Sequence, residues 1–130
     1  MDKEVEEKLV KDFPQIFRDW GGNPMETCMA WGLETGTGWA PLIRKLCEDI
    51  MATNPSENFK AAQVKEKFGG LRFYFDGGDE QISKLIHKAE TESYKTCEEC
   101  GIKENVTTKG PGWIRTLCDK CRSPIDTRKD

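Results

Sequence analysis

Four cysteines near the C-terminus have the residue type and the spacing of a metal site. They form two Cys-x2-Cys pairs separated by 17 residues: Cys97, Cys100, Cys118 and Cys121. A two-residue spacer lets two thiolates bind one tetrahedral ion, and the second pair completes the coordination. Because four protein ligands leave no position for water, the pattern predicts a structural zinc ion and no catalysis at the metal. A redox-active pair and disulfide bonds are the alternatives.

Basic and aromatic side chains are concentrated in residues 63–75. The alternating pattern of this segment predicts a β-hairpin whose two-residue turn is Gly69-Gly70. In that register one face of the hairpin carries three cations and one aromatic ring, namely Lys65, Lys67, Arg72 and Tyr74. Such a face suits a phosphate with a stacked base or sugar, and a solvated sheet face is the alternative.

The other face of the predicted hairpin is apolar, includes Phe68 and Phe73, and is expected to join the core. Its one charged member is Glu66, whose carboxylate must pair with a cation, acquire a raised pKa or lie at the rim of the apolar layer. Trp39 offers a second aromatic ring for stacking. The residues predicted to bind an anionic ligand are Lys65, Lys67, Arg72, Tyr74, Trp39 and Glu66.

A glycine-rich segment, Thr35-Gly36-Thr37-Gly38, precedes a predicted helix. One interpretation is a turn with a threonine cap. The other is an anion site at the helix N-terminus, although neither a dinucleotide fingerprint nor a phosphate-loop lysine follows. The sequence leaves both interpretations open.

The hydrophobic pattern predicts the elements that position these residues. Cys28 and Cys47 fall in apolar stretches and are expected to be small core side chains rather than nucleophiles. His87, the only histidine, lies beside an apolar stripe and is expected to have no chemical role. Helices are predicted at 2–13, 40–51 and 79–94, an irregular strand at 25–35, and two short strands between the cysteine pairs at 105–109 and 113–117.

The composition narrows the class of protein. Of 130 residues, 33% are charged and 36% are hydrophobic, which allows a modest core that a metal ion would help to stabilise. The formal net charge of −3 disfavours non-specific binding to duplex DNA. Without a membrane-length apolar run or a secretion signal, the chain is expected to be cytoplasmic, where reduced thiols favour zinc over disulfides.

The predicted fold class is α+β, with about three helices packed on one face of a small antiparallel sheet, followed by a four-cysteine zinc ribbon. The alternating hairpin favours a sheet with one exposed face, because the strands of a parallel sheet are apolar on both sides. The predicted organisation is a core domain at 1–95, the ribbon at 96–122 and a flexible tail at 123–130.

Parts of the sequence resemble small uncharacterised proteins of phages and prophages. These parts are Gly38-Trp39 with Leu42-Ile43, the run Gln63–Tyr74, and the helix that leads into Cys97-x2-Cys100. The likeness covers roughly residues 36–121, and the run QVKEKFGGLRFY is its most specific part. The resemblance implies an accessory protein in the host-cell cytoplasm. Phage proteins of this size are often inhibitors of host defence, some of which sequester nucleotide signals.

Three functions are consistent with these residues. The first is non-enzymatic binding of a small anionic, nucleotide-like ligand, with sequestration of a host defence signal as its role. The second is a zinc-ribbon adaptor that binds a protein partner or single-stranded nucleic acid through basic residues such as Arg115 and Arg122. The third is an enzyme with Glu66 as a base, but no nucleophile–base pair supports it. No membrane partner is expected, and the sequence leaves a homo-oligomer open.

Overall fold

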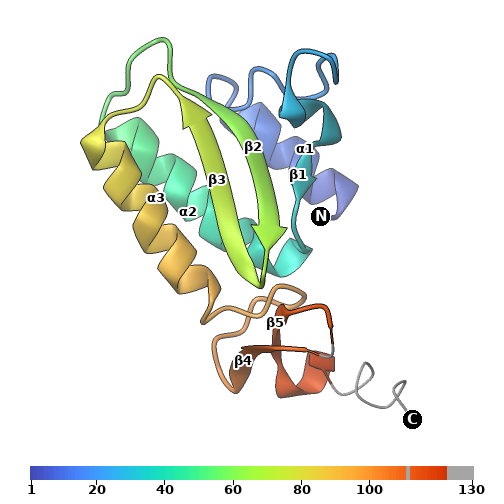
Figure 1. Cartoon of the computed structure of the whole chain (residues 1–130). Helices are drawn as coiled ribbons and strands as arrows, with labels where there is room; N and C mark the ends of the chain where they lie inside the picture. Colours follow the sequence, from blue (N-terminus) through green and yellow to red (C-terminus); the bar gives the residue numbers. More distant parts are fainter. Residues whose placement is uncertain (111, 123–130) are drawn as a thin grey trace.

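The computed structural model describes residues 1–110 and 112–122, so the predicted tail at 123–130 lies outside the described residues. The chain has the predicted α+β fold, in which helices pack on a small sheet and a short hairpin follows (Figure 1). The helices are α1 (Lys3–Asp12), α2 (Ala40–Ala52) and α3 (Glu80–Ser93), with 3-10 turns η1 (Cys28–Trp31) and η2 (Thr37–Trp39). The strands are β1 (Leu33–Glu34), β2 (Lys60–Lys67), β3 (Gly70–Asp76), β4 (Val106–Lys109) and β5 (Arg115–Cys118).

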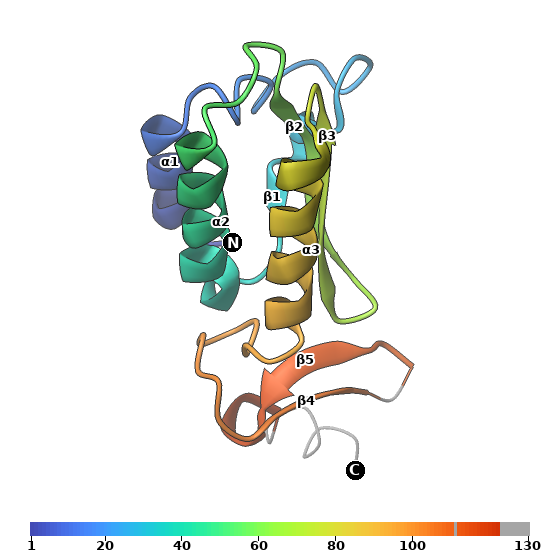
Figure 2. The same ribbon diagram turned by 90° about the vertical axis from the view of Figure 1, so that its left-hand side faces the viewer.

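The main sheet has the strand order β1-β2-β3. Strands β2 and β3 are antiparallel, as predicted, whereas the two-residue strand β1 pairs with β2 in parallel. Figure 2 shows α2 and α3 on one side of this sheet, with α1 beyond α2, and no described helix covers the opposite face. Side chains alternate between the two faces, so Val64, Leu71 and Phe73 are buried beneath the helices.

Local sequence explains where the helices begin. The Asp2 carboxylate accepts a hydrogen bond from the Glu4 N–H at the start of α1, and the Asp79 carboxylate accepts one from the Ile82 N–H at the start of α3. These caps satisfy N–H groups that have no partner within the helix. All three predicted helices are confirmed, with ends that differ by at most one residue. Their apolar stripes meet the sheet in one core, which includes Leu9, Phe17, Met29, Trp39, Ile43, Ile50, Phe59 and Ile82.

The turn between β2 and β3 is one residue earlier than predicted. Lys67 pairs with Gly70, so the turn residues are Phe68 and Gly69, with φ of 54° and 85°. Two successive positive φ angles are those of a type I′ turn, whose twist matches that of the strands. Phe68 is therefore 65% exposed at the tip of the hairpin, which corrects its predicted place in the core.

Gly70 lies in β3, where the side chain of Tyr94 leaves no room for a Cβ atom. A Cβ atom on Gly70 would overlap the hydroxyl oxygen of Tyr94 and would lie 2.9 Å from its Cε1. A glycine is therefore needed at this position so that Tyr94, at the end of α3, can pack against the strand. Gly70 is not one of the two turn residues. The one-residue shift also places Lys65, rather than Lys67, opposite Arg72.

The strand predicted at 25–35 is wrong for most of its length. The Thr27 hydroxyl accepts a hydrogen bond from the Met29 N–H (3.1 Å) and so starts the 3-10 turn η1. Gly32, with φ of 76°, ends that turn, and only β1 remains as strand. Because Cys28 opens the 3-10 turn, its side chain is exposed, which corrects its predicted burial.

Candidate functional site

The four cysteines of the two pairs converge on one point, and their geometry fits a metal ion. The sulfur atoms of Cys97, Cys100, Cys118 and Cys121 all lie within 4.8 Å of one another. The Sγ atoms of Cys100 and Cys118 are 3.7 Å apart. A tetrahedral ion with metal–sulfur bonds of about 2.3 Å separates its ligands by about 3.8 Å, so the four thiols are already arranged as one coordination shell.

Short turns bring the thiols together. After Cys97, the Gly101 N–H donates to the Cys97 carbonyl (2.9 Å), and the φ of 84° at Gly101 closes the first turn. In the second pair, the Cys121 N–H donates to the Cys118 sulfur (3.4 Å). The strands β4 and β5 lie between the two pairs, as the spacing predicts, and with the buried Leu117 they form a small second cluster.

The environment of Cys97 favours its thiolate. Burial raises the pKa of this thiol, but backbone N–H groups of Cys100, Cys118 and Glu99 outweigh burial and lower the pKa to about 7. Cys47 is the opposite case, because burial in the core raises the pKa of its thiol far above the usual range. Cys47 is therefore a core side chain, as predicted, and is not a nucleophile.

The glycine-rich segment is the place where the cysteine cluster joins the core. The Gly38 N–H donates to the Glu98 carbonyl (2.7 Å), and the Gly36 N–H donates to the Glu98 carboxylate (2.8 Å). A Cβ atom on Gly38 would lie 2.6 Å from both the Glu98 carbonyl oxygen and the Gly101 nitrogen. The anion site at this helix N-terminus is therefore occupied by Glu98 of the same chain. No threonine side chain caps α2.

Trp39 fixes the same junction from inside the core. Its side chain is fully buried, and its indole N–H donates to the Thr96 carbonyl (2.9 Å) just before the first cysteine. This burial corrects the predicted role of Trp39 in stacking on a ligand, because neither face of the ring is open to solvent. One further hydrogen bond crosses the junction, from the Thr116 hydroxyl of β5 to the Gly69 carbonyl (2.5 Å).

A Trp39→Phe substitution tests this structural role. We expect it to lower the free energy of unfolding by about 1–3 kcal/mol, because it leaves the Thr96 carbonyl buried without a donor. Urea denaturation followed by circular dichroism measures the change. Trp113→Phe is the matched control, since Trp113 is 72% exposed, and a change within about 0.5 kcal/mol is expected there. Equal stability of the two variants would contradict the role of the indole bond.

Three of the predicted ligand-binding residues are available on the uncovered sheet face. Lys65 and Lys67 project from β2 and Tyr74 from β3, and Tyr74 is 45% exposed. We call these three residues the open face. Neither lysine forms an ion pair with a described residue. By register Glu34 of β1 lies beside Lys65, so the positive field is strongest toward the hairpin tip.

Arg72 and Glu66 have partners within the fold. The Arg72 guanidinium pairs with the Glu90 carboxylate of α3. Tyr94 and Glu90 raise the pKa of Arg72 against the opposing effect of burial. The Glu66 carboxylate accepts a hydrogen bond from the Gly69 N–H (2.7 Å) and so supports the hairpin turn. These contacts give both residues a structural role that their sequence positions did not reveal.

Sequence reasoning missed Glu98 and misjudged the arginines of the C-terminal hairpin. Glu98 is 5% exposed, and burial raises the pKa of its carboxyl although Gly36 and Arg115 act in the other direction. Arg115 forms an ion pair with Glu99 (2.8 Å). The buried Arg122 donates to the carbonyls of Thr107, Lys109 and Arg115. Neither arginine is thus a free surface charge for nucleic acid, and no local motif signalled these contacts.

Searches with this chain against family models, curated proteins and solved structures found no match. Among the described residues, no helix has the length and apolar character needed to cross a membrane.

Proposed function

We propose that this chain is a zinc-stabilised, non-enzymatic binding protein for an anionic partner. Zinc is the metal that four thiolates in a tetrahedral arrangement most often bind in proteins with reduced thiols. Four protein ligands close the coordination shell, so the ion contributes folding free energy and carries out no reaction. The anionic partner must therefore bind to another surface of the protein.

The uncovered face of the sheet is the observation that carries this proposal. Its two lysines have no ion-pair partner among the described residues, and the ring of Tyr74 lies on the same face. Two ammonium groups beside an exposed ring suit a phosphate whose base or sugar stacks on the ring. A nucleotide-like ligand is our first candidate, and sequestration of a defence signal is the role suggested by the resemblance to phage proteins.

Exposed aromatic residues near the hairpin tip favour a second candidate, an extended partner. Phe68 is 65% exposed, and the adjacent Gly69 packs on Thr108 and Ile114 of the C-terminal hairpin. The Lys67 ammonium lies 5.7 Å from the centroid of the Phe68 ring, so Phe68 adjoins the open face, and Trp113 of the C-terminal hairpin is also exposed. Flat surfaces with several rings suit a single-stranded nucleic acid or an acidic protein better than a small ligand.

The double variant Lys65→Ala/Lys67→Ala tests the proposal. Titrations would use adenosine diphosphate by calorimetry and a fluorescent single-stranded oligonucleotide by anisotropy. We expect the unmodified protein to bind at least one probe and the double variant to lose about tenfold or more in affinity, because two phosphate contacts are removed. Saturable binding of adenosine diphosphate favours the nucleotide-like ligand. Binding of the oligonucleotide alone, with a strong salt dependence, favours the adaptor.

Lys3→Ala/Lys8→Ala is the matched control, since these lysines lie on or at the start of α1, away from the open face (Figure 2). The control should bind each probe as the unmodified protein does. No binding of either probe by the unmodified protein, or equal losses in the two double variants, would refute a role for the open face.

A further inference from the structure

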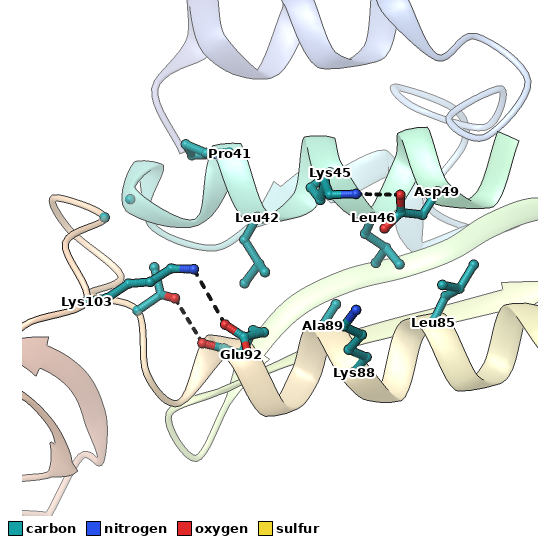
Figure 3. Close-up of a pocket in the computed structure, with 13 residues that line it drawn as sticks. Pro41, Leu42, Lys45, Leu46, Asp49, Leu85, Lys88, Ala89, Glu92 and Lys103 are labelled. Atoms are coloured by element: carbon teal, nitrogen blue, oxygen red, sulfur yellow. Dashed lines mark hydrogen bonds and ion pairs between the residues drawn. The ribbon is translucent and has the colours of Figure 1, made fainter. Parts of the chain in front are cut away.

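We propose a second binding site, for an amphipathic monoanion, in the cavity between α2 and α3 (Figure 3). The cavity has a volume of about 310 Å³. This value is at the lower end of the range of about 300–1,000 Å³ for small-molecule sites, so the ligand is small. The cavity lies among the helices, on the other side of the molecule from the open face, and its ligand is independent of the function proposed above.

The floor of the cavity is apolar. Leu42 and Leu46 contribute from α2, and Leu85 and Ala89 contribute from α3. Each pair is four residues apart and therefore lies on one side of its helix. Figure 3 shows the two pairs facing each other across the cavity. This floor suits a short hydrocarbon chain or ring, whose transfer from water is favourable by about 25 cal/mol per Å² of buried apolar area.

The rim of the cavity carries an excess of positive charge. Lys45 is paired with Asp49 (2.7 Å), and Lys103 is paired with Glu92 (3.5 Å). Lys88 is the third lysine of the lining, and it forms no ion pair within the part of the chain that the structure describes. Figure 3 shows the Lys88 amino group directed from α3 toward α2. One unpaired ammonium above an apolar floor fits a ligand with a single negative charge.

Residues on either side of the first cysteine pair line one end of the cavity. Thr96, Gly101 and Lys103 line this end, next to Gly38. The cavity volume of about 310 Å³ limits the length of the ligand and excludes a long peptide helix. A medium-chain carboxylate has the size, the apolar body and the single charge that the cavity requires.

Calorimetric titration of the zinc-loaded full chain with decanoate tests this site. We expect saturable binding of one decanoate per chain. Lys88→Glu should weaken decanoate binding about fivefold or more, since it replaces an attraction with a repulsion. Lys84→Glu is the matched control, because Lys84 lies one turn away on the same exposed side of α3 but outside the cavity lining. The affinity of this variant for decanoate should change by less than about twofold.

Two further measurements separate this cavity from other surfaces. Leu42→Gln makes the partly exposed floor polar and should also weaken decanoate binding, whereas Lys65→Ala/Lys67→Ala should leave it unchanged. Decanol and decyltrimethylammonium should bind more weakly than decanoate. No saturable decanoate binding, equal effects of the two α3 charge reversals, equal binding of the three probes, or loss of decanoate binding in the open-face variant would each overturn the proposal.

Discussion

Cys118→Ser is expected to abolish metal binding and to lower the free energy of unfolding by at least about 4 kcal/mol. Cys118 is buried at the end of β5, and its sulfur lies 3.7 Å from that of Cys100. Structural zinc contributes about 10–16 kcal/mol in isolated zinc-finger peptides, so loss of one of four ligands removes a large part of the stability of a short-stranded segment. Urea denaturation and metal analysis of the purified protein measure the two effects.

Cys28→Ser is the control for this experiment. The Cys28 side chain is exposed and lies outside the cysteine cluster, so a change within about 0.5 kcal/mol and full metal content are expected. If Cys118→Ser keeps its metal, or is as stable as Cys28→Ser, the four thiols are not a structural metal site.

Gly38→Ala is expected to lower the free energy of unfolding by about 3 kcal/mol or more. A Cβ atom at this position would overlap the Cys97 carbonyl oxygen and would lie 2.6 Å from two further backbone atoms. Backbone atoms cannot rotate away as a flexible side chain can, so the loop carrying Cys97 must move as a whole. The metal affinity should fall as well, because the displaced loop holds two of the four ligands.

Gly21→Ala is the matched control for the substitution of a glycine. Gly21 has a φ of 74° and no atom within 4 Å of the added Cβ, so only backbone strain of about 1 kcal/mol is expected, with unchanged metal affinity. Similar losses of stability in the two variants, with metal affinity unchanged in both, would contradict the close packing of the cysteine cluster on the core.

The cysteine cluster and the helices could be predicted because their signals are local. A Cys-x2-Cys pair specifies its own geometry, and Asp79 marks the start of α3 by its position before an apolar stripe. The alternation of apolar and polar residues also predicted which side of the hairpin would be buried. In each case the residues that decide the structure are neighbours in the sequence.

The turn of the hairpin and the role of the glycine-rich segment depend on contacts between distant residues. Gly70 and Gly38 are glycines because Tyr94 and the Cys97 loop approach their backbones, and neither neighbour is close in sequence. The sequence does not predict the burial of Trp39, because an aromatic residue after a glycine turn fits either a core or a binding site. The partner of its indole N–H is 57 residues away, which no local pattern reveals.

Native mass spectrometry of the chain purified from cells without oxygen and without an added thiol reductant tests the central claim most directly. We predict one zinc ion per chain, with all six cysteines reduced and the ion released only by unfolding, acid or a strong chelator. A metal-free folded chain, or a chain with a disulfide among Cys97, Cys100, Cys118 and Cys121, would contradict it.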